Sequence, residues 1–337
     1  MTGTAKYTIV LPVRNGGEYL KLCVKSILDQ AFREFNLVIL ENCSTDGTSE
    51  WIKTLTDPRI QIIAAEKSLS IEENWQRITK IKKNEFITLI GHDDLLHPDY
   101  LSEMDVLIQK YPEASLYQTH FNLINSKGAV IRPAKKMREK ESAVEFLGAV
   151  LQNRFDLFGT GFMLRSKDYD MVGGIPPYPN LLFGDFQLWM EVTKKGYKVT
   201  SPKTCFSYRV HQSTTKTSSD AKMHAAFNEF ISYLQSLKKE SNDFKSAIEN
   251  YFPAFLDAYV KGLAHRLLRT PIAKREGLTV EKFLQQSKAH ADRLIPHNVF
   301  DPLGQRSVRL AKIIDSNPVF RNLFILFRKV YPKPILK

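Results

Sequence analysis

The sequence predicts an α/β fold in which a mainly parallel central sheet is flanked by helices and followed by a helical C-terminal region. Short apolar runs rich in Val and Ile alternate with amphipathic segments through residues 1–100, as is typical of βαβ units. Strand signals then become sparser and fade beyond about residue 216, where the chain reads as helices to its end.

Strands and helices are expected to alternate through the first half of the chain. The run "YTIVLPV" is expected to be a buried strand, and the helix after it carries apolar residues at a helical spacing. Ser70 and Glu73 have capping-box spacing at the start of a later helix. A further helix is expected to begin after Pro98. The predicted strands are residues 7–13, 35–41, 59–66 and 86–90.

The second half has a mixed pattern. Residues 115–132 are expected to form a strand that runs into a hairpin at 126–128. A helix is predicted over 141–151, and an α+β segment follows. We therefore predict an α/β half at 1–115, an α+β half of the same domain at 116–215 and a helical region at 216–337.

Charge and cysteine content limit the class of protein. The 337 residues carry a net charge of +12 at pH 7, which suits anionic partners. Nucleic acid is disfavoured because the basic residues are scattered. The three cysteines show no zinc spacing, and a sparse count favours a reducing compartment. No signal peptide or membrane-span pattern occurs, so we expect a cytoplasmic protein, or one held peripherally on the cytoplasmic face of a membrane.

The C-terminal segment combines aromatic and basic residues. Phe320, Leu323, Phe324, Phe327 and Val330 share one helical face. The basic residues around it are Arg321, Arg328, Lys329, Lys333 and Lys337. Such a helix suits an anionic membrane surface, and packing on its own domain explains it equally well.

Polar side chains follow three of the predicted strands. Parallel strands present their carboxyl ends at one edge of the sheet, where ligands bind. Two adjacent acids there need compensation, and a hard divalent cation such as Mg²⁺ or Mn²⁺ supplies it while bridging phosphates. Alone, such a pair is more often a solvated loop or a helix cap. The residues at these strand ends are Pro12, Arg14, Asn15, Glu41, Asn42, Ser44, His92, Asp93 and Asp94.

Four motifs in order resemble those of the family 2 glycosyltransferases, which have the GT-A (nucleotide-diphospho-sugar transferase) fold. The first two are "LPVRN" with a helix that ends in "SILDQ", and "ENCSTDGT" after the second strand. The third, "GHDD", is similar to the family's metal-binding region. The fourth comprises "FGDFQLWMEV", similar to its acceptor-side segment, and "SYRVH". The motifs span about residues 7–215.

The resemblance assigns roles to residues. It implies that Asp185 is the general base and that Pro12, Arg14, Asn15, Glu41 and Asp93 bind the donor. It also implies that Asp93, Asp94 and His211 surround the metal ion. Three positions depart from the family pattern. Arg14 replaces a Tyr, Glu41 replaces an Asp, and Gly91 replaces the first Asp of the metal motif.

We therefore predict a metal-dependent, inverting glycosyltransferase of surface polysaccharide biosynthesis. Its partners would be a nucleotide-diphosphate sugar, a glycan or lipid-linked acceptor, and an anionic membrane surface. One alternative is a non-catalytic sugar- or nucleotide-binding protein that keeps the fold. The other is a sugar nucleotidyltransferase, although that class needs a Gly-rich, basic loop that "PVRNGGEYL" supplies poorly.

Overall fold

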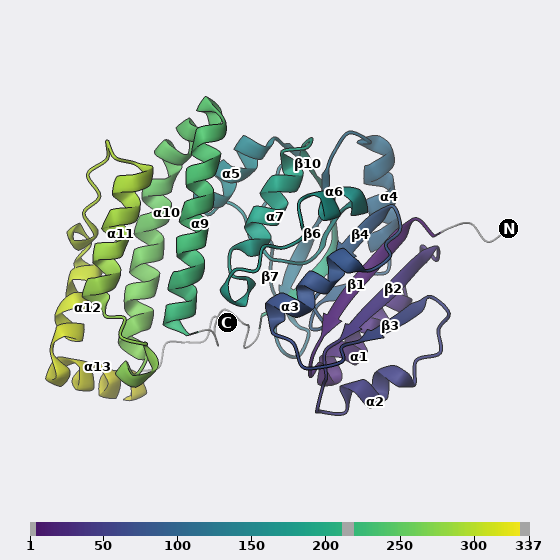
Figure 1. The fold of residues 1–337 in the computed structure, drawn as a ribbon, viewed down its shortest axis with the longest axis horizontal. Helices are drawn as coiled ribbons and strands as arrows, with labels where there is room; N and C mark the ends of the chain where they lie inside the picture. The colour runs from purple at the N-terminus through teal and green to yellow at the C-terminus, as the bar shows by residue number, and fades with distance from the viewer. Residues whose placement is uncertain (1–4, 211–218, 331–337) are drawn as a thin grey trace. The chain divides into compact units, whose positions relative to one another are not determined.

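The computed structural model describes residues 5–210 and 219–330 (Figure 1). The chain divides into two compact units, one of residues 1–146 with 154–213 and the other of residues 147–153 with 214–337. The first contains the sheet, and the second is helical. Among the described residues, no helix is both long and apolar enough to cross a bilayer.

The α/β fold predicted from the sequence is confirmed. The described strands form one sheet in the order β3-β2-β1-β4-β9-β6-β10-β5, with β7 beside β6 and β8 beside β10. Pairing is parallel from β3 to β4 and between β6 and β10, whereas β9 runs antiparallel between β4 and β6. The strands are β1 Tyr7–Val13, β2 Phe35–Glu41, β3 Ile60–Ala64, β4 Phe86–Leu89, β5 Leu95–Leu96, β6 Leu116–Ile124, β7 Val130–Pro133, β8 Lys140–Glu141, β9 Phe162–Arg165 and β10 Lys198–Arg209.

The helices of the first unit lie between these strands. Ser70 and Glu73 form the predicted capping box at the start of α3, and Gly128 takes a φ of 84° in the predicted β6–β7 hairpin. The helices are α1 Gly17–Leu28, α2 Thr48–Lys53, α3 Ile71–Gln76, α4 Tyr100–Lys110, α5 Ala143–Leu151, α6 Ser166–Met171 and α7 Gly184–Thr193, with α5 crossing into the second unit.

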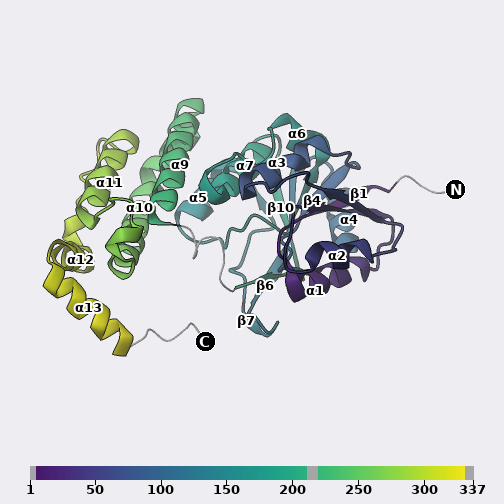
Figure 2. The same ribbon diagram turned by 60° about the horizontal axis from the view of Figure 1, so that its bottom comes forward.

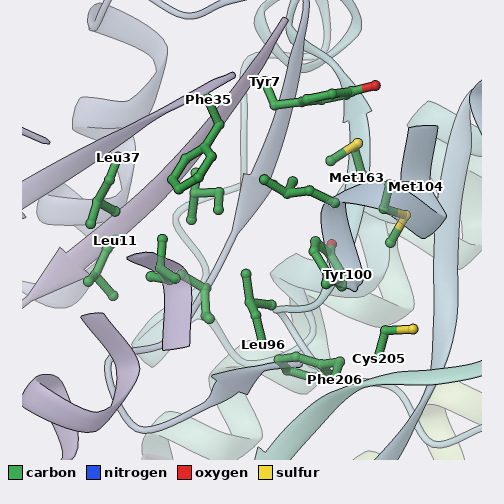
Figure 3. Packing of buried hydrophobic residues seen from close by; sticks show 14 of the residues in the cluster. Tyr7, Leu11, Phe35, Leu37, Leu96, Tyr100, Met104, Met163, Cys205 and Phe206 are labelled. Carbon is green, nitrogen blue, oxygen red and sulfur yellow. The ribbon is translucent and has the colours of Figure 1, made fainter. Parts of the chain in front are cut away.

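The sheet is covered on both faces, which explains why every residue of β1 is buried. On one face Tyr7, Leu11 and Leu37 pack with side chains of α1 and α4 (Figure 3). On the other face Phe162 stacks on Trp189 of α7, with ring centroids 4.5 Å apart. Helix α7 is therefore fixed against the centre of the sheet.

A buried glutamine explains the "SILDQ" motif. The Gln30 amide donates to the carbonyl oxygen of His97, and its oxygen accepts from the backbone N–H of Leu101. The Ser26 hydroxyl accepts from the backbone N–H of Leu96. The two side chains therefore hold the end of α1 against β5 and the start of α4, directly after the acidic segment at 93–94.

From residue 220 onward, the described part of the second unit is built of helices. Helices α9, α10 and α11 pack side by side, and α12 and α13 follow (Figures 1 and 2). Their bounds are α9 Asp220–Glu240, α10 Asn242–Arg269, α11 Val280–Leu294, α12 Arg306–Ser316 and α13 Pro318–Val330.

Candidate active site

The carboxyl ends of the parallel strands meet at one edge of the sheet. Val13 at the end of β1 pairs with Glu41 at the end of β2, and the Ile90 N–H donates to the carbonyl oxygen of Val10. Strand β10 ends at Arg209 and runs in the same direction, because it is parallel to β6. The acidic segment after β4 and the end of β10 therefore lie together.

Asp94 lies buried at the centre of this edge, with 1% of its surface exposed. One carboxylate oxygen accepts from the Thr160 hydroxyl at 2.7 Å, and the other accepts from the Arg209 backbone N–H at 2.9 Å. Burial and the neighbouring Asp93 raise the pKa of Asp94 well above its usual range, against the opposing effect of these hydrogen bonds. Asp94 thus joins three segments that meet at the edge.

Arg209 is also buried, at 2% exposure, and links the acidic segment to the β6–β7 hairpin. Its Nε donates to the Asp93 carbonyl oxygen at 2.7 Å, and its Nη1 donates to the Asn125 carbonyl oxygen at 3.0 Å. The guanidinium carbon lies 4.6 Å from the ring centroid of Tyr19 on α1. These contacts fix the backbone of Asp93, whose side chain is half-buried.

Asp185 stands in the first turn of α7, after Phe183 in a left-handed conformation. One carboxylate oxygen accepts from the Phe186 N–H at 2.8 Å. Gly159 runs close by, so a Cβ built there would lie 3.5 Å from the Asp185 carboxylate. Burial raises the pKa of Asp185 to about 6, although the Phe186 N–H opposes the shift. A carboxylate that titrates near neutral pH suits a general base.

Tyr208 connects the two acidic groups. Burial raises its pKa, and the negative charges of Asp94, Asp93 and Asp185 raise it further, so the phenol lies within electrostatic reach of all three. Its ring stacks on Phe158, with centroids 3.6 Å apart. The hydroxyl, which stays protonated, makes no hydrogen bond with any residue in the described ranges. It is therefore a donor available to a ligand.

The loops after β1 and β2 form the adjoining part of the edge. Asn15 takes a φ of 53°, and its side chain accepts from the Thr45 N–H at 2.8 Å. The Thr48 hydroxyl accepts from the N–H groups of Gly16 and Gly17 at the start of α1. Pro12 is buried, whereas Arg14 is exposed and donates to the Leu69 carbonyl oxygen at 3.3 Å.

Glu41 is turned toward its own loop. Its oxygens accept from the Ser44 N–H at 2.7 Å, the Cys43 N–H at 3.1 Å and the Ser49 hydroxyl at 2.7 Å. Burial alone would raise the pKa of Glu41, but these hydrogen bonds outweigh it and hold the pKa below its usual range. The carboxylate therefore stays charged and shapes the loop beside Arg14.

The structure thus brings Asp93, Asp94 and Asp185 together around Tyr208. Arg14, Asn15 and Glu41 lie on the neighbouring loops, and His211 falls outside the described residues. Sequence reasoning gave no role to Tyr208 or Thr160. The "SYR" motif marked the position of Tyr208, but its place among three carboxylates depends on packing against Phe158.

The metal prediction rests on few ligands. Within residues 5–210 and 219–330, no group of three His, Cys, Asp or Glu side chains is arranged to hold an ion. Both oxygens of Asp94 already accept hydrogen bonds, although each keeps a second lone pair. The carboxylate oxygens of Asp93 and Asp94 are the type of ligand that Mg²⁺ and Mn²⁺ prefer.

Comparison with known sequences gives family relationships. Residues 8–173 match the profile of the family described as glycosyl transferase family 2. The chain is 22% identical over 208 residues to the putative teichuronic acid biosynthesis glycosyltransferase TuaG of Bacillus subtilis, covering 60% of this chain and 78% of that protein. It is 23% identical over 123 residues to the glycosyltransferase GlyG of Streptococcus pneumoniae, covering 36% of this chain.

Other relatives are longer than the matched region. The chain spans 41% of GlyG. It also spans 29% of the uncharacterized protein y4gI of Sinorhizobium fredii, to which it is 23% identical over 269 residues and 74% of its own length.

Solved structures share the fold at low identity. S. aureus TarS 1–349 in complex with UDP-GlcNAc has a TM-score of 0.67 and 13% identity, covering 96% of this chain and 92% of that one. The mannosyltransferase PcManGT of Pyrobaculum calidifontis, in complex with GDP-Man and Mn²⁺, has a TM-score of 0.51 and 14% identity, with coverage of 96% and 88%. These similarities concern the fold alone.

Proposed function

This chain belongs to glycosyl transferase family 2, and we propose that it moves a sugar from a nucleotide-diphosphate sugar to a hydroxyl of a glycan or glycolipid, with inversion. The observation that carries the proposal is the placement of Asp93 and Asp185 around Tyr208. In this proposal Asp93 borders the diphosphate, and Asp185, whose pKa burial raises to about 6, borders the acceptor hydroxyl.

Asp185 acts as the general base in this proposal. Its carboxylate accepts the proton of the acceptor hydroxyl while that oxygen bonds to the anomeric carbon. The bond from that carbon to the diphosphate oxygen breaks, and the nucleoside diphosphate leaves with the electron pair. A single displacement of this kind inverts the anomeric centre, and a positioned base contributes about 10²–10⁴-fold to the rate.

Asp93 would hold a Mg²⁺ or Mn²⁺ ion that arrives with the diphosphate, with Asp94 and His211 near it. When bound, the ion supplies positive charge to the leaving diphosphate. The chain's own contribution is position, because Arg209 fixes the Asp93 backbone and Thr160 fixes Asp94.

The loops after β1 and β2 would hold the nucleoside, through Pro12, Arg14, Asn15 and Glu41. Arg14 is exposed and has donors available for a base or a phosphate. Related folds have been solved with UDP-GlcNAc and with GDP-Man.

The acceptor class and location extend the same proposal. The name of TuaG refers to teichuronic acid biosynthesis, and an acceptor in surface polysaccharide assembly accords with that similarity. A glycan or lipid-linked acceptor would be met on the cytoplasmic side of a membrane, where nucleotide sugars are made.

The test is a panel of nucleotide sugars assayed for release of nucleoside diphosphate, with Mn²⁺ or Mg²⁺ and mixed glycan and glycolipid acceptors. We expect one donor to be consumed by the wild type, and Asp185→Asn to lower that turnover about 10²–10⁴-fold. The control is Glu191→Gln on the same helix, where Glu191 pairs with Lys194 at 3.0 Å, and its turnover should match the wild type.

The outcomes separate the alternatives. A non-catalytic binding protein would bind a nucleotide sugar and consume none. A nucleotidyltransferase would form nucleotide sugar from a sugar phosphate and a nucleoside triphosphate, with release of pyrophosphate. Unchanged turnover in Asp185→Asn would remove this residue from the mechanism.

A further inference from the structure

Helix α13 is docked with its charged side inward and its apolar side outward. Arg321 is 4% exposed, and its guanidinium donates to the Thr270 carbonyl oxygen at 2.6 Å. Asp315 stands at the end of α12. Its Oδ1 lies 3.9 Å from Nη1 of Arg321 and 2.7 Å from Nη1 of the buried Arg275. The sequence groups Arg321 with the basic residues around the apolar face. In the structure its side chain is buried instead and anchors α13 to the end of α10.

The outward side of α13 is apolar along its length. Its exposed side chains are Val319 at 63%, Phe320 at 48%, Leu323 at 57%, Leu326 at 60%, Phe327 at 56% and Val330 at 63%. Two apolar residues of the preceding helix α12 are exposed as well, namely Leu310 at 56% and Ile313 at 47%. We call these eight residues the α12–α13 apolar face. Large exposed apolar side chains gathered along one side of a helix mark an interaction surface.

Polar contacts of Arg321, together with the partly buried Phe324 and Ile325, hold α13 in this orientation. A helix held only by apolar packing would turn Phe320, Leu323 and Phe327 toward its own unit. Here the ion group of Arg275, Asp315 and Arg321 holds the helix with those residues outward. The surface is therefore built to be covered by something other than the core beneath it.

Charge indicates what covers it. Residues 316–337 contain no Asp or Glu, and apart from the buried Arg321 they carry Arg328, Lys329, Lys333 and Lys337. A symmetric contact between two copies of the chain would join two segments of the same net positive charge, which is unfavourable. An anionic lipid surface instead attracts them while its acyl region takes up the apolar side chains.

We propose that the α12–α13 apolar face inserts into the interface of an anionic membrane and holds the protein there. Phe320, Leu323 and Phe327 enter the boundary between headgroups and acyl chains, and the net positive charge that residues 316–337 carry in the sequence favours anionic headgroups over neutral ones. This attachment does not depend on the proposed transfer reaction, and it would bring a lipid-linked acceptor to the protein.

The experiment uses the full chain and flotation with vesicles of phosphatidylcholine alone or with about one third phosphatidylglycerol. The wild type should bind the anionic vesicles about tenfold or more above the neutral ones, and added salt should weaken binding. The variant Phe320→Ser/Leu323→Ser/Phe327→Ser should lose about tenfold or more of that binding. All three residues are exposed, so the fold should persist, as checked by the melting temperature.

A matched control replaces three exposed apolar residues elsewhere. Val106→Ser/Val130→Ser/Met171→Ser changes side chains that are 53%, 59% and 66% exposed in the first unit, and binding should not change. Equal vesicle binding by the α13 variant and the wild type would overturn the proposal. A wild type that does not bind vesicles would also overturn it, either as a monomer or as a dimer that the α13 variant dissociates. The dimer result would show that a second copy covers the face.

Discussion

Replacement of Asp94 tests how the candidate site is held together. In Asp94→Ala, the Thr160 hydroxyl and the Arg209 backbone N–H lose their acceptor in a buried place. Each unpaired buried donor costs about 1–3 kcal/mol, so we expect about 2–6 kcal/mol less unfolding free energy. For a unit of this size, that corresponds to a melting temperature lower by roughly 5–20 °C.

The isosteric change Asp94→Asn should behave differently. Its amide oxygen still accepts from the Arg209 N–H, and its NH₂ group donates to the Thr160 oxygen. The change also removes a buried charge that lies beside Asp93, the arrangement that raises the pKa of Asp94. We therefore expect stability within about 1 kcal/mol of the wild type.

The assay is denaturant unfolding of the full chain, followed by tryptophan fluorescence. Thr160→Val breaks the same hydrogen bond from the other side and should cost about 1–3 kcal/mol. Thr204→Val, at an exposed position of the same sheet, serves as the control and should have little effect. If Asp94→Asn destabilises the protein as much as Asp94→Ala, charge rather than hydrogen-bond geometry holds the site, and the reasoning fails.

Three further predictions concern protonation and ligand contact. The kcat/KM for transfer should fall as the pH drops below about 6, because the Asp185 carboxylate must be unprotonated to act as a base, and a profile flat to pH 5 would contradict this. Burial, with His224 and Arg293, lowers the pKa of His290 to about 4. In the unfolded chain this histidine has an ordinary pKa of about 6.5. Between pH 4 and about 6.5 the unfolded chain therefore binds more protons than the folded protein. Stability should therefore fall by about 1–3 kcal/mol as the pH drops from about 6.5 to 4, and urea unfolding of His290→Gln should show a smaller fall. Tyr208→Phe should lower kcat/KM about 10–100-fold, while calorimetry should find the affinity for nucleoside diphosphate unchanged. Equal losses of kcat/KM and of nucleoside diphosphate affinity would mean that the hydroxyl contacts the nucleotide and not the sugar or the acceptor.

Local patterns were sufficient to predict most of the α/β unit. The strands at Tyr7–Val13 and Phe35–Glu41 match their predicted limits, because runs of buried β-branched residues end at polar loops. The predicted capping box at Ser70 is present for the same reason, since it depends on residues three positions apart. Motif order was also sufficient to identify the family.

Features that depend on distant packing were not accessible in this way. The antiparallel position of β9 between β4 and β6 has no local signal. Asp94 accepts hydrogen bonds from Thr160 and Arg209, which lie 66 and 115 positions further along the chain. The same holds for Arg321, whose burial depends on a carbonyl oxygen 51 positions away. The assignment of Asp185, Asp93 and the donor-binding residues stays a prediction, because their roles require a bound ligand.

The most direct test of the central claim is a crystal structure of the chain with a nucleoside diphosphate and Mn²⁺. We predict that the diphosphate and the ion lie beside the Asp93 carboxylate, with the end of the diphosphate that carries the sugar facing Tyr208 and Asp185. A diphosphate bound away from this edge of the sheet, or one whose outer phosphate points away from Asp185, would contradict the proposed reaction.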